Sequence, residues 1–132
     1  MPDKSDKSER WFTPRTARQT LDSLRPVAET LCRLYRRLER ARPKRILPEQ
    51  PVDREYFSLV TRLHVVITEI HRCGAQITDL RRGQLDFPAR RAGRQVLLCW
   101  QVGEATVRYW REPEAGFAGR QPVDEDGPWE EA

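Results

Sequence analysis

Apolar residues recur along the first third of the chain at alternating steps of four and three, which is the spacing of one face of a helix. Thr13 can cap the start of this helix, and Pro14 suits its first position. Pro26 interrupts the series, and a proline inside a helix removes one backbone hydrogen bond and crowds the preceding turn. We therefore predict a helix over residues 14–41 with a kink near residues 22–25. The members of the series are Ala17, Leu21, Leu24, Ala28, Leu31, Tyr35 and Leu38.

A second series with helical spacing follows after a proline-containing loop at residues 42–52. Asp53 can cap the start of the second helix, and Gly74 stands where a glycine commonly ends one. We predict this helix over residues 54–73 and expect it to pack antiparallel to the first one. Its apolar residues are Tyr56, Leu59, Leu63, Val66, Ile70 and Cys73.

Beyond Gly74 the spacing changes to the alternation that is typical of short strands. Gln76–Leu80 and Leu85–Pro88 are predicted to be extended, with a turn between them. The sheet as a whole is predicted over residues 76–112 and is followed by a glycine-containing loop over residues 113–121.

The clearest predicted hairpin joins Gln95–Gln101 to Ala105–Glu112 through Gly103-Glu104, a pair that suits a type II′ turn. In this register Leu98 faces Tyr109 on the neighbouring strand. One face of the hairpin is then apolar enough to pack on the helices, and the opposite face is half polar. The apolar face would consist of Val96, Leu98, Trp100, Val107 and Tyr109.

These elements predict an α+β fold, in which a long antiparallel helical hairpin is followed by a small antiparallel β-sheet. At 132 residues the chain has room for one domain, which we place at residues 11–121. Residues 1–10 are charged and lack periodicity, and residues 122–132 carry five acids and no base, so both are expected to be disordered tails. Because so small a sheet cannot cover both helices, we expect a homodimer or a higher homo-oligomer.

The composition indicates the cellular location of the protein and the state of its cysteines. No stretch approaches the ~18 apolar residues of a membrane helix, and the first residues contain no apolar signal segment, so we expect a cytoplasmic protein without a membrane partner. Cys32, Cys73 and Cys99 are odd in number and widely spaced, which fits neither a disulfide framework nor a paired-cysteine metal site. Each lies in an apolar series, so we expect core or partly buried thiols.

The segment from Leu85 to Gln121 gathers aromatic residues, glycines, arginines and acids, and it carries the pieces DFP, LCW, GE, YW and GFAGR in that order. On these pieces, and on the Trp-Phe-Thr that opens the first helix, the chain resembles the bacterial proteins grouped as domain of unknown function 2203. The resemblance spans roughly Trp11 to Pro122. In that family a His commonly follows the YW pair, where this chain has Arg111. The family has no established activity, so the resemblance implies domain boundaries and no reaction.

Charged side chains among aromatic ones make this segment the predicted binding site. An arginine on a glycine-flanked loop can hold a carboxylate or a phosphate through two parallel hydrogen bonds. The alternative is structural, with Asp86 capping a turn and Arg111 paired with Glu112 or Glu104. We predict an oligomeric, non-catalytic protein that docks a protein or a small anionic ligand here. The binding residues would be Trp110, Arg111, Glu112, Phe117 and Arg120, with Asp86 and Glu104 as orienting acids.

A basic stripe on the first helix supports an alternative function, which is nucleic-acid binding. Its residues recur at helical spacing and continue into the loop, and such clusters contact phosphates. No RNA-binding or helix-turn-helix motif accompanies them, and a solvated helix face has the same pattern. The acidic tail could shield this stripe within the same chain. The stripe consists of Arg33, Arg36, Arg37, Arg40, Lys44 and Arg45.

A metal-dependent enzyme is the third alternative. His64 and His71 are seven residues apart on one helical face, too far to share an ion, and no further cysteine or histidine cluster completes a site. The chain also lacks the glycine motifs of a nucleophile elbow, a phosphate-binding loop and a dinucleotide site. We therefore predict no metal site, no cofactor and no catalytic residue.

Overall fold

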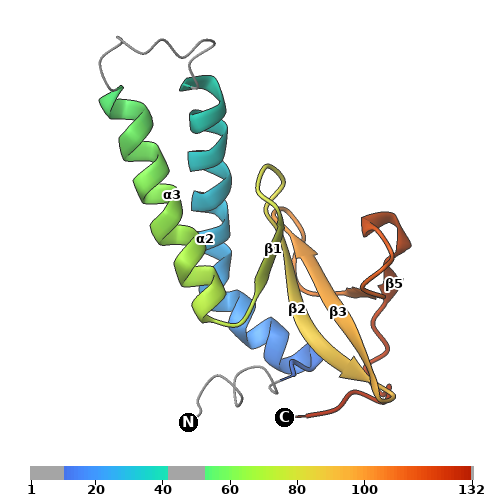
Figure 1. The fold of residues 1–132 in the computed structure, drawn as a ribbon. Coiled ribbons are helices and arrows are strands. Elements are labelled where there is room, and N and C mark those ends of the chain that lie inside the picture. Colours follow the sequence, from blue (N-terminus) through green and yellow to red (C-terminus); the bar gives the residue numbers. More distant parts are fainter. Residues whose placement is uncertain (1–10, 42–52, 132) are drawn as a thin grey trace.

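Two helices followed by a five-stranded sheet make up the chain in the computed structural model, which describes residues 11–41 and 53–131 (Figure 1). Helix α2 spans Pro14–Ala41 and helix α3 spans Arg54–Arg72. The two helices pack side by side, and Figure 1 shows the first part of α2 running at an angle to the rest, as expected for a helix that contains Pro26. The predicted α+β fold is confirmed. In the described part of the chain, neither helix has the length and apolar character needed to cross a membrane.

Both helices begin with the caps that the sequence predicts. Thr13 Oγ1 accepts a hydrogen bond from the backbone N–H of Thr16 (3.2 Å), and the Thr16 hydroxyl oxygen accepts one from the backbone N–H of Thr13 (2.8 Å). This reciprocal arrangement satisfies N–H groups near the helix start that have no partner within the helix. Asp53 accepts in the same way from the N–H of Tyr56 (3.2 Å), and Gly74, with a φ angle of +93°, follows the end of α3.

The sheet is a meander in which each strand pairs antiparallel with the next one along the chain. Its strands are β1 (Gln76–Asp79), β2 (Gln84–Arg91), β3 (Arg94–Gln101), β4 (Tyr109–Arg111) and β5 (Gln121–Pro122). The longest hairpin joins β2 to β3 through Ala92 and Gly93, whose φ angles are +52° and +78°. Two positive φ angles fit a type I′ turn, whose twist matches that of the strands.

Strand β2 is longer than the predicted segment Leu85–Pro88, because the chain stays extended beyond its proline. Pro88 has no N–H group, and the N and C=O of one strand residue point to the same side. Its C=O accepts a hydrogen bond from the N–H of Phe12 (2.8 Å), on the side away from β3. The missing donor therefore costs the β2–β3 pairing nothing, and the prediction that the strand ends at Pro88 is wrong.

The pairing of β3 with β4 differs by one residue from the predicted register. Leu98 lies opposite Trp110, and Cys99 lies opposite Tyr109. Strand β4 is also short, since residues 102–108 form a connecting loop in place of the predicted two-residue turn. A shift of one residue turns every side chain to the other face, so Trp110 takes the place of Tyr109 on the side of the helices. The predicted register is wrong.

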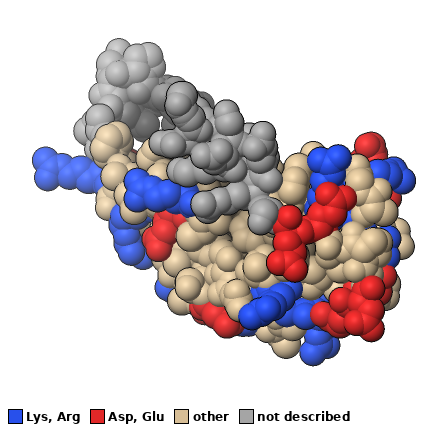
Figure 2. Space-filling model, turned by 90° about the horizontal axis from the view of Figure 1, so that it is seen from below, with Lys and Arg blue, Asp and Glu red and all other residues tan. Residues whose placement is uncertain are grey.

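The C-terminal residues differ from expectation as well. Residues 122–131 are packed on the domain, and the Trp129 ring lies against Trp110 with the ring centroids 6.2 Å apart, so the prediction of a disordered acidic tail is wrong over this range. Figure 2 shows acidic and basic side chains beside one another on the side seen from below, where the C-terminus lies in Figure 1. The expected tail at residues 1–10 and the loop at residues 42–52 lie outside the described residues.

The hydrophobic core lies between the helices and one face of the sheet. The predicted helix series supplies much of it, although Tyr35 is only half-buried. Cys32 and Cys99 are buried free thiols as expected, whereas Cys73 is exposed because it caps the end of α3 and does not continue the apolar face. The largest fully buried side chains include Trp100, Phe87, Leu21, Leu24, Leu31, Leu59 and Ile70.

The turn between β2 and β3 generates a first prediction. Ala92 adopts a φ angle that costs alanine about 1 kcal/mol and that asparagine tolerates better, so Ala92→Asn should raise the free energy of unfolding by about 0.5–1 kcal/mol. The measurement is urea unfolding followed by circular dichroism. Gly93→Ala is the matched control, because a Cβ there meets open space and strain of the backbone alone should lower stability by about 1 kcal/mol. Equal stability of Ala92→Asn and the parent chain would contradict this account of the turn.

Candidate functional site

The two faces of the sheet differ in character. One face packs on the helices and holds Phe87, Leu98 and Trp100. On the opposite face the strand register places Asp86, Cys99 and Tyr109 side by side across β2, β3 and β4. We call this second surface the polar face of the sheet, and it consists of Thr78, Asp86, Cys99, Tyr109 and Arg111. The candidate site lies here.

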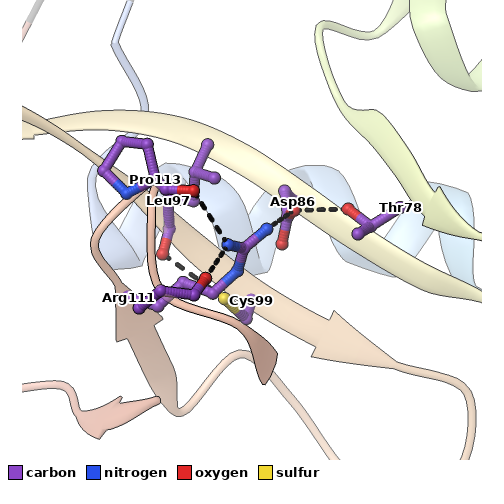
Figure 3. A network of polar contacts seen from close by, with 7 residues as sticks. Thr78, Asp86, Leu97, Cys99, Arg111 and Pro113 are labelled. Carbon is purple, nitrogen blue, oxygen red and sulfur yellow. Dashed lines mark hydrogen bonds and ion pairs between the residues drawn. The ribbon is translucent and has the colours of Figure 1, made fainter. Parts of the chain in front are cut away.

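A buried ion pair between Asp86 and Arg111 is the centre of the polar face (Figure 3). Arg111 Nη2 donates to Asp86 Oδ2 at 2.7 Å, and the side chains of Arg111 and Asp86 are 10% and 5% exposed. The hydroxyl of Thr78 on β1 donates to the same carboxylate oxygen. Arg111 Nη1 donates to the C=O groups of Pro113 and Ala115 in the loop after β4. The pair therefore joins three strands and holds the following loop against the sheet.

The buried surroundings shift two pKa values. Burial lowers the pKa of Arg111, but the hydrogen bond and the negative charge of Asp86 outweigh this effect, so the pKa is raised above its ordinary value. Burial, and after it the charge of Asp86, raises the pKa of Cys99 to about 12. Arg111 is thus charged and Cys99 is a neutral thiol at neutral pH. A protonated thiol is a weak nucleophile and a weak metal ligand, which makes Cys99 a packing residue.

A second ion pair lies at the edge of the polar face. Arg120 Nη1 donates to Glu104 Oε2 at 2.8 Å, and the Arg120 guanidinium lies over the rings of Tyr109 (4.3 Å) and Phe117 (3.7 Å). Glu104 Oε1 accepts a hydrogen bond from the N–H of Gln101 at the end of β3 (3.1 Å). Carboxylate and ring faces both attract the guanidinium, so these contacts fix the loop after β4 over the sheet.

Trp110 and Glu112, two further predicted binding residues, lie elsewhere. Glu112 forms an exposed ion pair with Arg94 on β3 (3.2 Å). Trp110 lies on the other side of the sheet, where the Arg91 guanidinium (4.8 Å from the ring centroid) and the Trp129 ring contact it. The structure thus divides the predicted binding residues between the two faces of the sheet and does not bring them together in one site.

The alternative pairings that the sequence suggested are also corrected. Arg111 pairs with Asp86, and neither Glu112 nor Glu104 contacts it as an ion-pair partner in the described part of the chain. Asp86 bonds to side chains across the sheet and does not cap a turn. Period-two alternation with the correct register would have shown which residues share the polar face. The residues that contribute to these contacts and were not predicted are Thr78, Arg91, Cys99, Tyr109 and Trp129.

The basic stripe lies on α2, and acids and carbonyl groups take up part of it. Arg37 forms an ion pair with Glu55 on α3 (3.6 Å), and Arg36 donates to the C=O of Arg81 (3.4 Å). Arg33 donates to a threonine hydroxyl one turn earlier (3.1 Å). A groove of about 390 Å³ is lined by Arg36, Glu39, Arg40 and Arg81. The last two residues of the stripe, in the loop, lie outside the described residues.

Metal ligation has no prepared position among residues 11–41 and 53–131, since no three His, Cys, Asp or Glu side chains there are placed to hold an ion. His64 and His71 are exposed on α3. Asp86 and Glu104 each accept hydrogen bonds from an arginine. The polar face therefore offers an arrangement of charges that are already paired within the chain.

Comparison with known proteins places the chain beside one family of uncharacterised proteins. The model of a family described as "Uncharacterized conserved protein (DUF2203)" matches residues 10–123. No curated protein and no solved structure matches the chain. The matched range contains both helices, the whole sheet and both ion pairs of the polar face, and it ends just before Asp124.

Removal of one partner of the buried pair should be costly. Asp86→Asn leaves the Arg111 guanidinium buried without its counter-charge, and the loss in unfolding free energy should be on the order of 3–5 kcal/mol. In the matched control, Glu112→Gln removes an exposed partner of Arg94 and should cost less than about 1 kcal/mol. Urea unfolding followed by tryptophan fluorescence gives both values. If Asp86→Asn lost no more stability than Glu112→Gln, the pair would not be what holds the loop on the sheet.

The three thiols should differ in reactivity. The pKa of Cys99 in the folded state is raised to about 12, so the thiol stays protonated as well as buried at pH 8, and iodoacetamide should not modify it in the native protein. Cys73 is exposed and should be modified under the same conditions. Mass spectrometry of digested samples measures both, and labelling in urea, where all three cysteines should react, is the control. Native labelling of Cys99 as fast as that of Cys73 would contradict the buried position.

Proposed function

The chain belongs to the family of uncharacterized conserved proteins DUF2203, as its sequence motifs predicted, and from this premise we propose that it acts by association, without catalysis. Two copies would form a homodimer through the exposed side of α3. The family supplies no activity that could be transferred, so the proposal rests on the surface of the molecule. The observation that carries it is a set of large apolar side chains exposed on one helix.

Phe57, Val60 and Val65 on α3 are 63%, 40% and 61% exposed. At about 100° per residue they lie within one side of the helix, together with uncharged residues at neighbouring positions. We call this surface the outer side of α3, and it consists of Phe57, Val60, Thr61, His64, Val65 and Thr68. Contiguous exposed apolar surface of this kind marks a contact with another molecule more often than isolated residues do.

No helix or strand in the described part of the chain covers this side of α3. Leu59, Leu63 and Ile70 bury the opposite side of the helix in the core. Helix α2 stands between α3 and most of the sheet (Figure 1), and its Arg25 lies over the ring of Trp100 on β3. Helix α3 comes close to β1, the strand that follows it. A second helical hairpin packed on the outer side of α3 would complete a four-helix arrangement, which is the geometry expected from the heptad-like spacing.

The charge pattern favours a second copy of this chain as the occupant. A two-fold interface brings one surface onto itself, so any charge on it meets a like charge. The outer side of α3 has no Asp, Glu, Lys or Arg among its six residues, whereas charged residues such as Arg62 and Glu69 flank it. Arg54 and Arg72 lie at the two ends of this side, so its central part can meet a second copy without like-charge repulsion. Each apolar side chain that the interface buries contributes about 25 cal/mol per Å² of covered surface.

The sequence also suggested that Arg111 and Arg120 bind a small anionic ligand, and this hypothesis has less support. Arg111 and Arg120 each have a carboxylate partner and further contacts within the chain. An anion would have to displace Asp86 or Glu104 to reach them. The geometry thus favours association through α3 over ligand binding at the polar face.

Light scattering coupled to size exclusion tests the dimer, with untagged protein at several concentrations. The parent chain should elute with twice the mass of one copy. Phe57→Glu with Val65→Glu places two charges per copy on the interface, and like charges that meet across it should reduce the dimer fraction at least about tenfold.

Arg62→Glu is the matched control, because it changes the charge of the same helix at an exposed position beside the outer side of α3. It should leave the mass unchanged. Circular dichroism checks that each variant keeps its helices. The proposal would be contradicted by a parent chain that stays monomeric at high concentration, or by a dimer that persists after the double substitution.

A further inference from the structure

The last residues of the chain lie across the domain as a strap, which we define as residues 124–131. Its acids meet arginines from two different elements. Glu125 accepts two hydrogen bonds from the Arg18 guanidinium of α2 (2.9 and 2.7 Å), and Asp124 accepts one from Arg91 of β2 (2.6 Å). These hydrogen bonds lower the pKa of both acids below their usual values. A third acid, Glu130, lies 3.5 Å from Arg90 Nε and accepts from the N–H of Gly93 (2.7 Å).

The strap also has an aromatic anchor. The Trp129 ring meets Trp110 edge-on, with an angle of 85° between the rings. The Arg91 guanidinium lies 4.8 Å from the centroid of Trp110 and 5.5 Å from that of Trp129, so it contacts both rings while it bonds to Asp124. Arg91 thus contacts a carboxylate and an indole ring of the strap at the same time.

Backbone hydrogen bonds add a third type of contact. The N–H of Ala92 donates to the C=O of Pro128 (3.0 Å), and the N–H of Glu130 donates to the C=O of Arg90 (2.9 Å). Arg91 and Trp129 form an antiparallel bridge. Strand β1 pairs only with the beginning of β2, and Phe12 bridges Ala89 further along the same edge. Among the described residues, the strap takes up the part of this edge that remains, at Arg90 and Arg91. An extended peptide added to a sheet edge is a common way in which domains bind peptides.

We call the receiving surface the arginine cradle, and it consists of Arg18, Arg90, Arg91 and Trp110. All four residues lie within the range matched by the family model, which ends at residue 123, while the strap lies beyond it. The Nε–H groups of Arg90 and Arg91 are buried and make no hydrogen bond among the described residues, and the Glu130 carboxylate lies 3.5 Å from Arg90 Nε. A groove of about 490 Å³ also remains open between the start of α2 and the strap. The strap therefore leaves the Arg91 Nε–H in the cradle without a partner, and it borders a groove at the start of α2.

We infer that the arginine cradle is a docking site for an acidic, tryptophan-containing peptide segment of a partner protein, and that the strap occupies this site within the same chain. Charge alone would also suit a nucleic acid. The edge of β2 favours a peptide, because its backbone groups pair with another backbone, and because a tryptophan and a guanidinium of the cradle both contact the tryptophan ring of the strap. The strap would then act as a competitor, which a better-matched peptide must displace.

The test uses the full chain with a weakened strap, Asp124→Asn, Glu125→Gln and Trp129→Ala together. The probe is a fluorescein-labelled peptide with the sequence of residues 121–131, and fluorescence anisotropy measures its binding. The variant should bind this peptide at least about tenfold more tightly than the parent chain, because a tethered competitor has a high effective concentration. Binding should weaken as salt is raised, since part of it is between exposed charges.

Two controls define the contacts. A peptide with amides in place of its acids and alanine in place of tryptophan should not bind the variant. Arg91→Gln added to the variant should weaken binding of the acidic peptide at least about tenfold, because Arg91 contacts both the acid and the ring. Circular dichroism checks that the variants are folded. If the triple variant is not, Asp124→Asn with Glu125→Gln keeps the tryptophan packing and takes its place.

The opposite results are equally clear. A folded variant that binds the peptide no better than the parent chain does would overturn the inference and make the strap a structural segment only. A labelled single-stranded oligonucleotide that binds the variant more tightly than the peptide does would overturn it in favour of a nucleic-acid site. Neither result bears on the dimer, because the outer side of α3 contains none of the residues changed here.

Discussion

A guanidinium that leaves water needs a counter-charge and hydrogen-bond acceptors, and Arg111 has both in a carboxylate of β2 and two carbonyl groups of the next loop. This requirement determines which way β4 faces. With Arg111 on the polar face, the period-two alternation of a strand sends Trp110 to the side of the helices. Trp110 then presents the ring against which Trp129 packs. The position of the strap thus depends on a charge pair formed on the opposite face of the sheet.

The helices follow from local sequence, and for this reason they could be predicted closely. Each cap involves residues three apart, and each apolar series repeats within one or two turns. The register of β3 and β4 depends on distant contacts. Asp86 and Arg111 are 25 positions apart, and Arg18 and Arg25 of α2 donate to the carbonyl groups of Val107 and Ala105 in the connecting loop. These contacts hold residues 102–108 in a longer loop than the local turn rule suggests for a Gly-Glu pair.

The amino-acid composition gave the wrong prediction for the strap, for a related reason. A segment with five acids and no base has no means of burying itself, and taken alone it predicts disorder. Its partners are arginines of α2 and β2, far away in the sequence, and a single tryptophan that packs on another. The candidate site shows the same limit. Most of the predicted residues do form charge pairs or ring contacts. Their partners depend on which face of the strand each residue occupies. The sequence pattern predicted the register of β3 and β4 with an error of one residue, and therefore assigned the residues of β4 to the wrong faces.

The two surfaces proposed for association are physically separate, which has a consequence for what the protein can do. The outer side of α3 lies beyond α2 from the sheet, while the arginine cradle is formed by the start of α2 with β2 and β4 (Figure 1). A dimer formed through α3 would therefore leave both cradles available, one on each copy. A partner with two acidic segments, or a partner that is itself a dimer, would then gain affinity from the second contact without any new interaction within the site, provided that its segments reach both cradles. The helical hairpin would set the distance between the cradles, and each sheet would set which peptide is bound.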